Sequence, residues 1–384
     1  MSERQPMQWE GEFPLRDGLI YLNHAAVGVW PRRTCEAVKA FAEENLRQGA
    51  TDYPYWMQIE RELRSRLQRL VNAVSVDDIA LVKNTSEGLS LLAYGLDWQP
   101  GDTIVSTNQE FPSNRIVWES LKDKGVELRL ADISTDDPEA AILALCDMNT
   151  RLLTVSSVQY ASGLRPNLEL LGEFCRDHDI IFCIDAIQSL GALTFDAQAC
   201  HADVVVADGH KWMLGPEGLA LLYTRAELRN QLTLNQYGWH MVERAGDFDR
   251  SDWQPAKSAR RFEPGSPNML GIYALNASLS LLEDAGMQEV QRRVLDRTRV
   301  LMDMILETSG CELLTPHEPG RFGGIVNFCF KGVSHAGHEH MYRQLMQQKV
   351  ICAFRGGGIR FSPHFYTPEA HLEKAVEMAI RMIG

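Results

Sequence analysis

The chain has 384 residues, which is enough for one large and one small domain with substantial cores. Its apolar and charged fractions are ordinary for a globular protein, and its net charge of −13 argues against a nucleic acid or an anionic membrane as the main partner. No apolar stretch approaches the roughly 20 residues of a membrane helix, and the polar N-terminus lacks a signal-peptide core, so we expect a cytoplasmic protein.

Strands and helices alternate through the first 225 residues. Apolar residues at i, i+3 and i+4 spacing predict an amphipathic helix over 56–72. Short apolar runs rich in β-branched residues predict buried strands. After a short strand within 12–33, the expected strands are 79–83, 103–107, 126–130, 152–156, 180–185, 203–207 and 218–223, and the other helices are 34–47, 84–96, 113–124, 137–146 and 168–178. This α/β alternation predicts a mostly parallel sheet with helices on both faces and ligands at the carboxyl ends of its strands.

The pattern changes after about residue 225. A polar, aromatic-rich segment at 235–267 precedes a long helical region at 269–309. Strands near 324–330 and 350–354 and a helix from about 368 are expected in the last part. We therefore predict an N-terminal arm at 1–20, a large domain at 21–265 and a smaller α+β domain at 266–384 that begins with the long linking helix.

The eight cysteines are scattered and form no C-x-x-C pair, so we expect reduced and mostly buried thiols. His335, His338 and His340 have a spacing that could suit a metal ion. Because no cysteine or carboxylate array accompanies them, we favour a solvated turn before a helix and predict no metal site.

Lys211 stands in a Gly-flanked turn directly after a buried strand. A desolvated lysine loses its proton more readily and becomes a nucleophile for a carbonyl group. The lysine that binds pyridoxal phosphate (PLP) as a Schiff base needs this property. Taken alone, the stretch is equally consistent with a surface lysine in a loop.

Asp185 ends another buried strand. A buried aspartate needs a cationic partner, and the protonated pyridine nitrogen of PLP is one. Gln188, three residues later, could then reach the phenolic oxygen of the ring. A helix N-cap is the alternative for Asp185.

Three further turns carry groups of interest. Thr85 and Ser86 stand where a strand leads into a helix, an arrangement that can bind a phosphate or only cap the helix. Phe111 follows the strand at 103–107 and could stack on a planar ring or pack in the core. Ser266 offers a hydroxyl at the start of the long helical region, with a plain turn as the alternative.

Together these segments resemble the class V aminotransferase group of PLP enzymes, which includes cysteine desulfurases, isopenicillin N epimerase-like enzymes and kynureninases. The resemblance extends from about Tyr21 to the C-terminus and implies the PLP-dependent transferase fold of type I. Its most specific part is Asp185-Ala-Ile-Gln188 followed by Gly209-His210-Lys211 and Gly215-Pro216. Further matches occur in the same order at 21–26, 84–88 and 262–268.

The resemblance implies roles by position. Lys211 would form the Schiff base, the internal aldimine, and would move the Cα proton of an α-amino acid. Asp185 would pair with the pyridinium nitrogen, and Gln188 and Phe111 would contact the phenolic oxygen and the ring. The phosphate would be held by Thr85, Ser86 and His210, and by Ser266 of the neighbouring subunit of a homodimer with shared sites. Substrate binding would fall to Arg360, through its fork of donors to a carboxylate, and to Asn23 and His24.

Four departures from the desulfurase pattern stand out. Desulfurases have a histidine over the ring at the position of Phe111. In this respect the chain is more like kynureninase. Asp208 stands where many members have a phosphate-binding serine, so we expect it to point elsewhere or to contact His210. Desulfurases carry a persulfide cysteine on a loop between two arginines, but only residues 356–359 separate Arg355 from Arg360. Cys352 lies in an apolar run and is expected to be a strand residue.

We therefore predict a homodimeric PLP enzyme that acts on an α-amino acid, most favourably a C–S lyase that eliminates at Cβ without a persulfide cysteine. Transamination and epimerisation are alternatives, because both begin with the same loss of the Cα proton. A non-catalytic PLP-fold binding protein is an alternative of another class. Candidate pocket residues, for which core or rim packing is equally consistent, are Trp239, His240, Trp253 and Tyr366.

Overall fold

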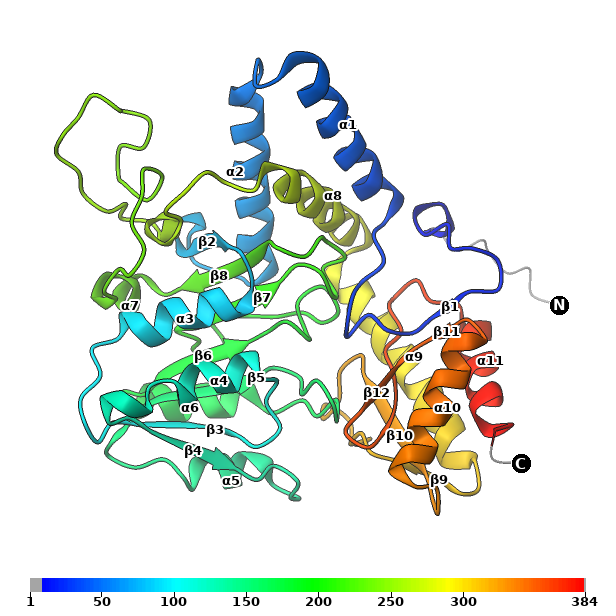
Figure 1. Cartoon of the computed structure of the whole chain (residues 1–384). Coiled ribbons are helices and arrows are strands. Elements are labelled where there is room, and N and C mark those ends of the chain that lie inside the picture. The colour runs from blue at the N-terminus through cyan, green and yellow to red at the C-terminus, as the bar shows by residue number, and fades with distance from the viewer. Residues whose placement is uncertain (1–8, 383–384) are drawn as a thin grey trace.

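The computed structural model describes residues 9–382 (Figure 1). The expected arm at 1–20 lies partly outside these residues. Its described part holds the short 3-10 helix η1 (Glu10–Glu12) and leads into β1 (Ile20–Tyr21).

A seven-stranded sheet occupies the centre of the larger part of the molecule, with the strand order β2-β8-β7-β6-β5-β3-β4. β8 runs antiparallel to both of its neighbours, and every other pair in this sheet is parallel. The expected mostly parallel sheet is therefore confirmed. The strands are β2 (Ile79–Val82), β3 (Thr103–Thr107), β4 (Glu127–Ala131), β5 (Thr150–Ser156), β6 (Ile181–Asp185), β7 (Val204–Asp208) and β8 (Ala220–Thr224).

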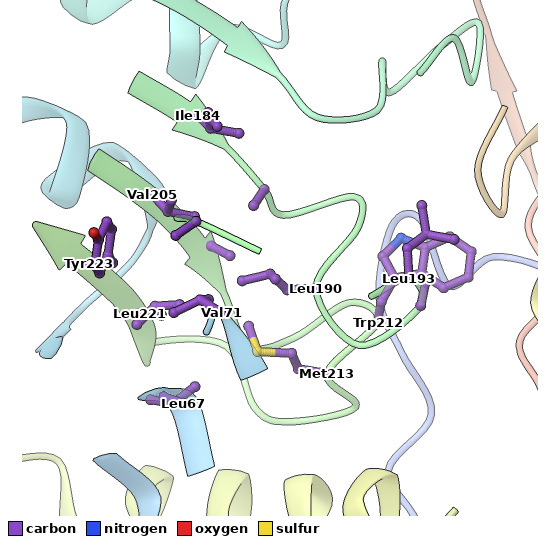
Figure 2. Packing of buried hydrophobic residues seen from close by; sticks show 14 of the residues in the cluster. Leu67, Val71, Ile184, Leu190, Leu193, Val205, Trp212, Met213, Leu221 and Tyr223 are labelled. Atoms are coloured by element: carbon purple, nitrogen blue, oxygen red, sulfur yellow. The ribbon is translucent and has the colours of Figure 1, made fainter. Parts of the chain in front are cut away.

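Side chains alternate between the two faces of this sheet and supply two separate cores. On β7, Val205 and Ala207 face the larger core, whereas Val204 and Val206 face the other. Figure 2 shows Val205 with Ile184, Leu221 and the Trp212 turn in the larger core. Because both faces are covered, the inner strands are mostly apolar, which is why their runs are readable in the sequence.

Helices cover both faces. The larger core takes side chains from α2 (Tyr53–Leu70), α5 (Pro138–Leu143), α6 (Leu168–Asp177) and α8 (Met269–Ala285), and α1 (Arg32–Gln48) packs on α8. The other core takes them from α3 (Thr85–Gly95), α4 (Ser113–Glu119) and α7 (Ala226–Gln231). Short 3-10 turns complete this part at η2 (Val76–Asp78), η3 (Lys122–Lys124) and η4 (Ala259–Phe262).

A smaller α+β unit follows, as expected. Its four-stranded antiparallel sheet has the order β12-β13-β10-β9. The strands are β9 (Cys311–Leu313), β10 (Val326–Phe330), β12 (Ala353–Arg355) and β13 (Gly358–Phe361), and the helices are α9 (Met287–Glu307), α10 (His335–Gln347) and α11 (Glu369–Ile380). A third core lies within this unit.

The expected domain boundaries at 20/21 and 265/266 stay a prediction, and packing connects the chain across them. The helical region at 269–309 is two helices that meet at Gly286, whose φ of 78° breaks the helix. α8 packs in the larger core, whereas Leu301 and Ile305 of α9 belong to the third. β1 pairs in parallel with β11 (Val350–Ile351), so the start of the large domain is joined to the small unit. The expected turn at His335–His340 is instead the first half of α10.

Candidate active site

A cavity of about 360 Å³ lies at the carboxyl ends of the central strands. Segments that follow β2, β3, β5, β6 and β7 form its walls, and the β12–β13 hairpin reaches it from the small unit. The cavity is lined by Ala25, Ala26, Asn84, Thr85, Ser86, Phe111, Ser113, Tyr160, Asp185, Ile187, Gln188, Asp208, His210, Lys211, Arg355 and Arg360. The sheet therefore gathers its polar strand ends at one edge, as a parallel sheet should.

Lys211 is buried in this cavity, and its Nζ lies 5.4 Å from the centre of the Phe111 ring. Burial lowers the pKa of Lys211 to about 8, although the negative charge of Asp185 acts in the opposite direction. Burial likewise raises the pKa of Asp185. The surface-loop alternative for Lys211 is thus wrong, because the amine is nearly enclosed and partly neutral at pH 7 to 8.

The turn after β6 presents Asp185 to the cavity. One carboxylate oxygen, Oδ1, accepts a hydrogen bond from the backbone N–H of Ile187, 3.0 Å away. A turn rather than a helix follows, so the N-cap alternative for Asp185 is wrong. A buried carboxylate with few protein donors is suited to a cationic partner.

Thr85 and Ser86 begin α3, but neither caps it. The cap is Asn84, whose Oδ1 accepts from the N–H of Glu87 at 2.9 Å. Thr85 Oγ1 is buried and has no hydrogen-bond partner among the described residues, and Ser86 Oγ donates to Ser113 Oγ at 2.9 Å. A hydroxyl left without a partner at a helix N-terminus fits an anionic ligand.

His210 and Asp208 lie together on the same side of the cavity. His210 Nδ1 is 3.0 Å from Asp208 Oδ1, at an angle outside that of a good hydrogen bond. The expected contact between these two residues is present, and it turns the carboxylate toward the imidazole ring.

Arg360 lies on β13 and is buried. Its Nη1 donates to the carbonyl of Tyr160 at 2.5 Å, and its Nε has no partner among the described residues. Burial, together with the charge of Arg355, lowers the pKa of Arg360 to about 10, so the guanidinium stays charged at neutral pH. No carboxylate of the described chain lies within ion-pair distance of either arginine, which leaves their charge free for a substrate anion.

Cys352 lies between β11 and β12 and does not line the cavity. Its side chain is 1% exposed, and burial raises the pKa of its thiol to about 12. The expected loop between Arg355 and Arg360 is a tight hairpin, with Gly356 and Gly357 at its turn. All eight cysteines are free, as expected, and four of them are buried.

Three predicted site residues lie elsewhere. His24 is fully buried and bonded at both ring nitrogens, so it cannot face a substrate in this conformation. Asn23 is half-buried beside it and does not line the cavity. Ser266 is exposed next to a separate pocket at the start of α8, which leaves its expected role across a dimer interface untested.

The four candidate pocket residues also lie outside the cavity. Trp239 and Trp253 line an outer cavity of about 910 Å³ formed by residues 237–257. His240 is buried near Glu263, and Tyr366 is buried against His24. Core and rim packing therefore account for all four.

Sequence reasoning missed Tyr160, Ser113, Arg355 and Glu110. Tyr160 and Arg355 line the cavity, and their positions after β5 and at the hairpin were available as signals. Glu110, directly before Phe111, is a buried carboxylate that accepts five hydrogen bonds from Thr107, Asn114, Ser156 and Gln159. It fixes the β3–α4 turn that carries Phe111.

Among residues 9–382, no cluster of histidine, cysteine or acidic residues is arranged to hold a metal ion. No helix in this range combines the length and the apolar character required to cross a membrane.

The cavity fits PLP in its chemistry. It offers a buried amine for an aldehyde, a buried carboxylate for a pyridinium nitrogen, an aromatic face and an unsatisfied hydroxyl at a helix N-terminus. These groups come from four different turns, so their meeting is a property of the fold.

Comparison with known proteins agrees with this chemistry. The model of the aminotransferase class-V family matches residues 20–364. A probable cysteine desulfurase of Methanothermobacter thermautotrophicus is 30% identical over 97% of each chain, and the uncharacterized aminotransferase YcbU of Bacillus subtilis is 26% identical over 98% of this chain and 97% of its own. The structure of a lysine-to-alanine variant of C-DES, with glycine covalently linked to its PLP cofactor, has a TM-score of 0.88 at 22% identity and covers 97% of this chain and 98% of C-DES. This chain is therefore a PLP-dependent enzyme that belongs to the class-V aminotransferase family.

Proposed function

We propose that this enzyme cleaves the Cβ–S bond of a cysteine-type amino acid by β-elimination, without a persulfide on the protein. The observation that carries the proposal is the absence of a thiol from the cavity wall. No cysteine lines the described cavity, and Cys352 is buried with a raised pKa. A persulfide relay needs an accessible thiolate, so the sulfur has to leave with a small product.

The names of two relatives support a substrate with a Cβ–S bond. One C-DES structure is a complex of this cystine C–S lyase with its reaction product cysteine persulfide. The Methanothermobacter relative is named a probable cysteine desulfurase. Both names concern sulfur bonded to Cβ of an amino acid, and we extend that substrate class to this chain.

The residues divide the work as follows. PLP, when bound, would supply an aldehyde for the substrate amine and a ring with the capacity to take up the electron pair from Cα. Arg360 binds the substrate carboxylate, and Lys211 Nζ takes the Cα proton. The electron pair then forms a Cα–Cβ double bond while the Cβ–S bond breaks, and the thiolate departs. The Lys211 amine would then displace the nitrogen of the three-carbon fragment, which leaves as 2-aminoacrylate, and water would hydrolyse this product to pyruvate and ammonia.

Asp185 and the phosphate-binding residues assist the loss of the Cα proton. Asp185 holds a positive charge at the ring nitrogen, which raises the capacity of the ring for electrons. Thr85, Ser86 and His210 would hold the phosphate. A second subunit would complete the phosphate site through Ser266, which is exposed at the start of α8. Mixing Lys211→Ala with Ser266→Ala subunits tests this last point, because complementation occurs only across a dimer.

A single-turnover experiment tests the reaction type. PLP-loaded enzyme is mixed with cysteine, cystine and S-alkyl cysteines, and the cofactor spectrum and ammonia are followed together. Release of ammonia, with return of the cofactor to its aldehyde form, is the expected result. A cofactor that stays in its amine form until a keto acid is added would instead establish transamination. Transamination is the second candidate because one relative is named an aminotransferase. Loss of substrate chirality without ammonia would establish epimerisation.

A further inference from the structure

The amide of Gln188 is held at both ends by groups that have a single hydrogen-bonding role. Its Oε1 accepts from the indole Nε1–H of Trp212 at 2.9 Å, and its Nε2 donates to the carbonyl of Ala25 at 3.0 Å. An indole N–H can only donate and a carbonyl can only accept. The orientation of this amide is therefore determined by chemistry, and a flipped amide would face two repulsive contacts.

This arrangement leaves one N–H of Gln188 Nε2 without a partner among the described residues. Gln188 lines the cavity, and Ala25 and Lys211 line it beside Gln188. A ligand atom that meets Gln188 thus finds a hydrogen-bond donor at Nε2. With the amide flipped, the carbonyl oxygen would stand in that place and would repel any anionic oxygen.

Trp212 is held by close packing on several sides. Its side chain is 0% exposed, in the core shown in Figure 2, and its carbonyl accepts from His364 Nε2 at 3.0 Å. Gly191 and Gly324 allow this close packing, because a Cβ on Gly191 would lie 2.3 Å from the Trp212 carbonyl oxygen and one on Gly324 would lie 2.4 Å from its ring. The turn after β7 thus carries both the Lys211 amine and the Trp212 indole N–H that orients the amide of Gln188.

We propose that Trp212 is a positioning residue whose indole N–H fixes Gln188 as a hydrogen-bond donor to the phenolic oxygen of the cofactor. The inference rests on the proposed PLP function and on the contact with the phenolic oxygen that the family resemblance implies for Gln188, but it does not depend on the reaction type. The donated hydrogen bond stabilises the negative form of the phenolic oxygen. Losing either Trp212 N–H or Gln188 should therefore make this oxygen a stronger base.

The test is a pH titration of the visible absorption band of the bound cofactor, with no substrate present. We expect Trp212→Phe and Gln188→Ala each to raise the midpoint by roughly 0.5 to 1 pH unit, the size of one hydrogen bond. The double variant should match Gln188→Ala alone, because Trp212 acts only through the amide. Trp98→Phe is the matched control: Trp98 is also buried and donates its indole N–H, at 2.6 Å, to the backbone carbonyl of Ala93. Its midpoint should equal that of the parent.

Trp212→Phe also removes ring volume from a packed core. Replacing Trp212 with 3-benzothienylalanine keeps the shape of the ring and removes only the N–H, so it separates the hydrogen bond from the packing. The proposal is overturned if this replacement leaves the midpoint unchanged, if the two effects add in the double variant, or if Trp98→Phe shifts the midpoint equally. An unchanged midpoint in Gln188→Ala would overturn it too, while leaving the single-turnover result for the lyase intact.

Discussion

At the scale of single residues, the environment of Lys211 decides what its amine can do. A lysine in water holds its proton tightly, whereas this one is enclosed beneath an aromatic ring. Asp185 moderates the effect, so the amine is poised rather than permanently neutral. That poise suits a group that must first attack an aldehyde and later receive a proton.

The first prediction concerns this amine in the cofactor-free protein. Only a neutral amine attacks the PLP aldehyde, and its population grows as the pH rises through the pKa. Because the pKa of Lys211 is lowered to about 8, the rate of PLP capture should rise with pH with a midpoint near 8. Stopped-flow absorbance measures the rate, and Lys211→Ala should show no covalent capture. A midpoint near that of an exposed lysine would contradict the desolvation argument.

Cys352 supplies the second prediction. If sulfur never passes through a protein thiol, Cys352→Ala should leave turnover within about twofold of the parent. The variant loses buried contacts, so unfolding should cost roughly 1 kcal/mol less free energy. Steady-state assays with cysteine and urea unfolding give both numbers. A loss of turnover that exceeds the loss of folded protein would return the persulfide mechanism to consideration.

At the scale of elements, the turn between β3 and α4 shows how one buried carboxylate arranges a loop. Glu110 accepts hydrogen bonds from Thr107, Asn114, Ser156 and Gln159, which reach it from β3, α4, β5 and the loop after β5. The adjacent Phe111 ring is thereby kept over Lys211.

The third prediction concerns the hydrogen bonds that the Glu110 carboxylate accepts. In Glu110→Gln the new NH₂ group must face at least one of these donors, so we expect a loss of roughly 2 to 3 kcal/mol in stability. Thr107→Val removes a single donor and should cost only about 1 kcal/mol. Urea unfolding compares the two. Equal losses would mean that the carboxylate is not the centre of the network.

The sequence predicted the elements whose signal is local. Most strands of the central sheet are buried on both faces and appear as apolar runs, although the edge strand β4 is partly exposed. The residues Asp185, Lys211 and Thr85 stand at or just after the ends of such strands. The sequence did not reveal β13, because its Gly-rich start resembles a loop until it pairs with β10 and β12. Nor did it reveal that His24 is buried, since only tertiary contacts with Ser362 and Tyr366 decide this.

At the scale of the whole molecule, His24 and His364 join the chain's two ends to the Lys211 turn. His24 Nδ1 faces the carbonyl of Ser362 and so carries the proton, which makes Nε2 the acceptor of the Tyr366 hydroxyl. His364 likewise donates from Nε2 to the carbonyl of Trp212 and accepts at Nδ1 from the N–H of Phe365. Burial lowers the pKa of both rings, so both are neutral in the folded protein.

The fourth prediction is a loss of stability in mild acid. The unfolded chain protonates His24 below about pH 6.5, whereas the folded pKa is about 4, so stability is complete above 6.5 and declines as the pH falls toward 4. At pH 5 this residue alone accounts for about 2 kcal/mol. Urea unfolding at pH 7 and pH 5 measures the difference, and His24→Gln should reduce it. An identical pH dependence in that variant would contradict the assignment.

The pairing of β1 with β11 also has a consequence for how the protein is made. His24 and Ser362, which lie just beyond this pairing, are 338 positions apart, so the ribosome must finish nearly the whole chain before either finds its partner. Until then Ile20 and Leu22, buried in the finished protein, lack β11, the strand that hydrogen-bonds to their segment. Contacts of such large sequence separation form late, so this junction is where the nascent chain stays open to wrong contacts longest.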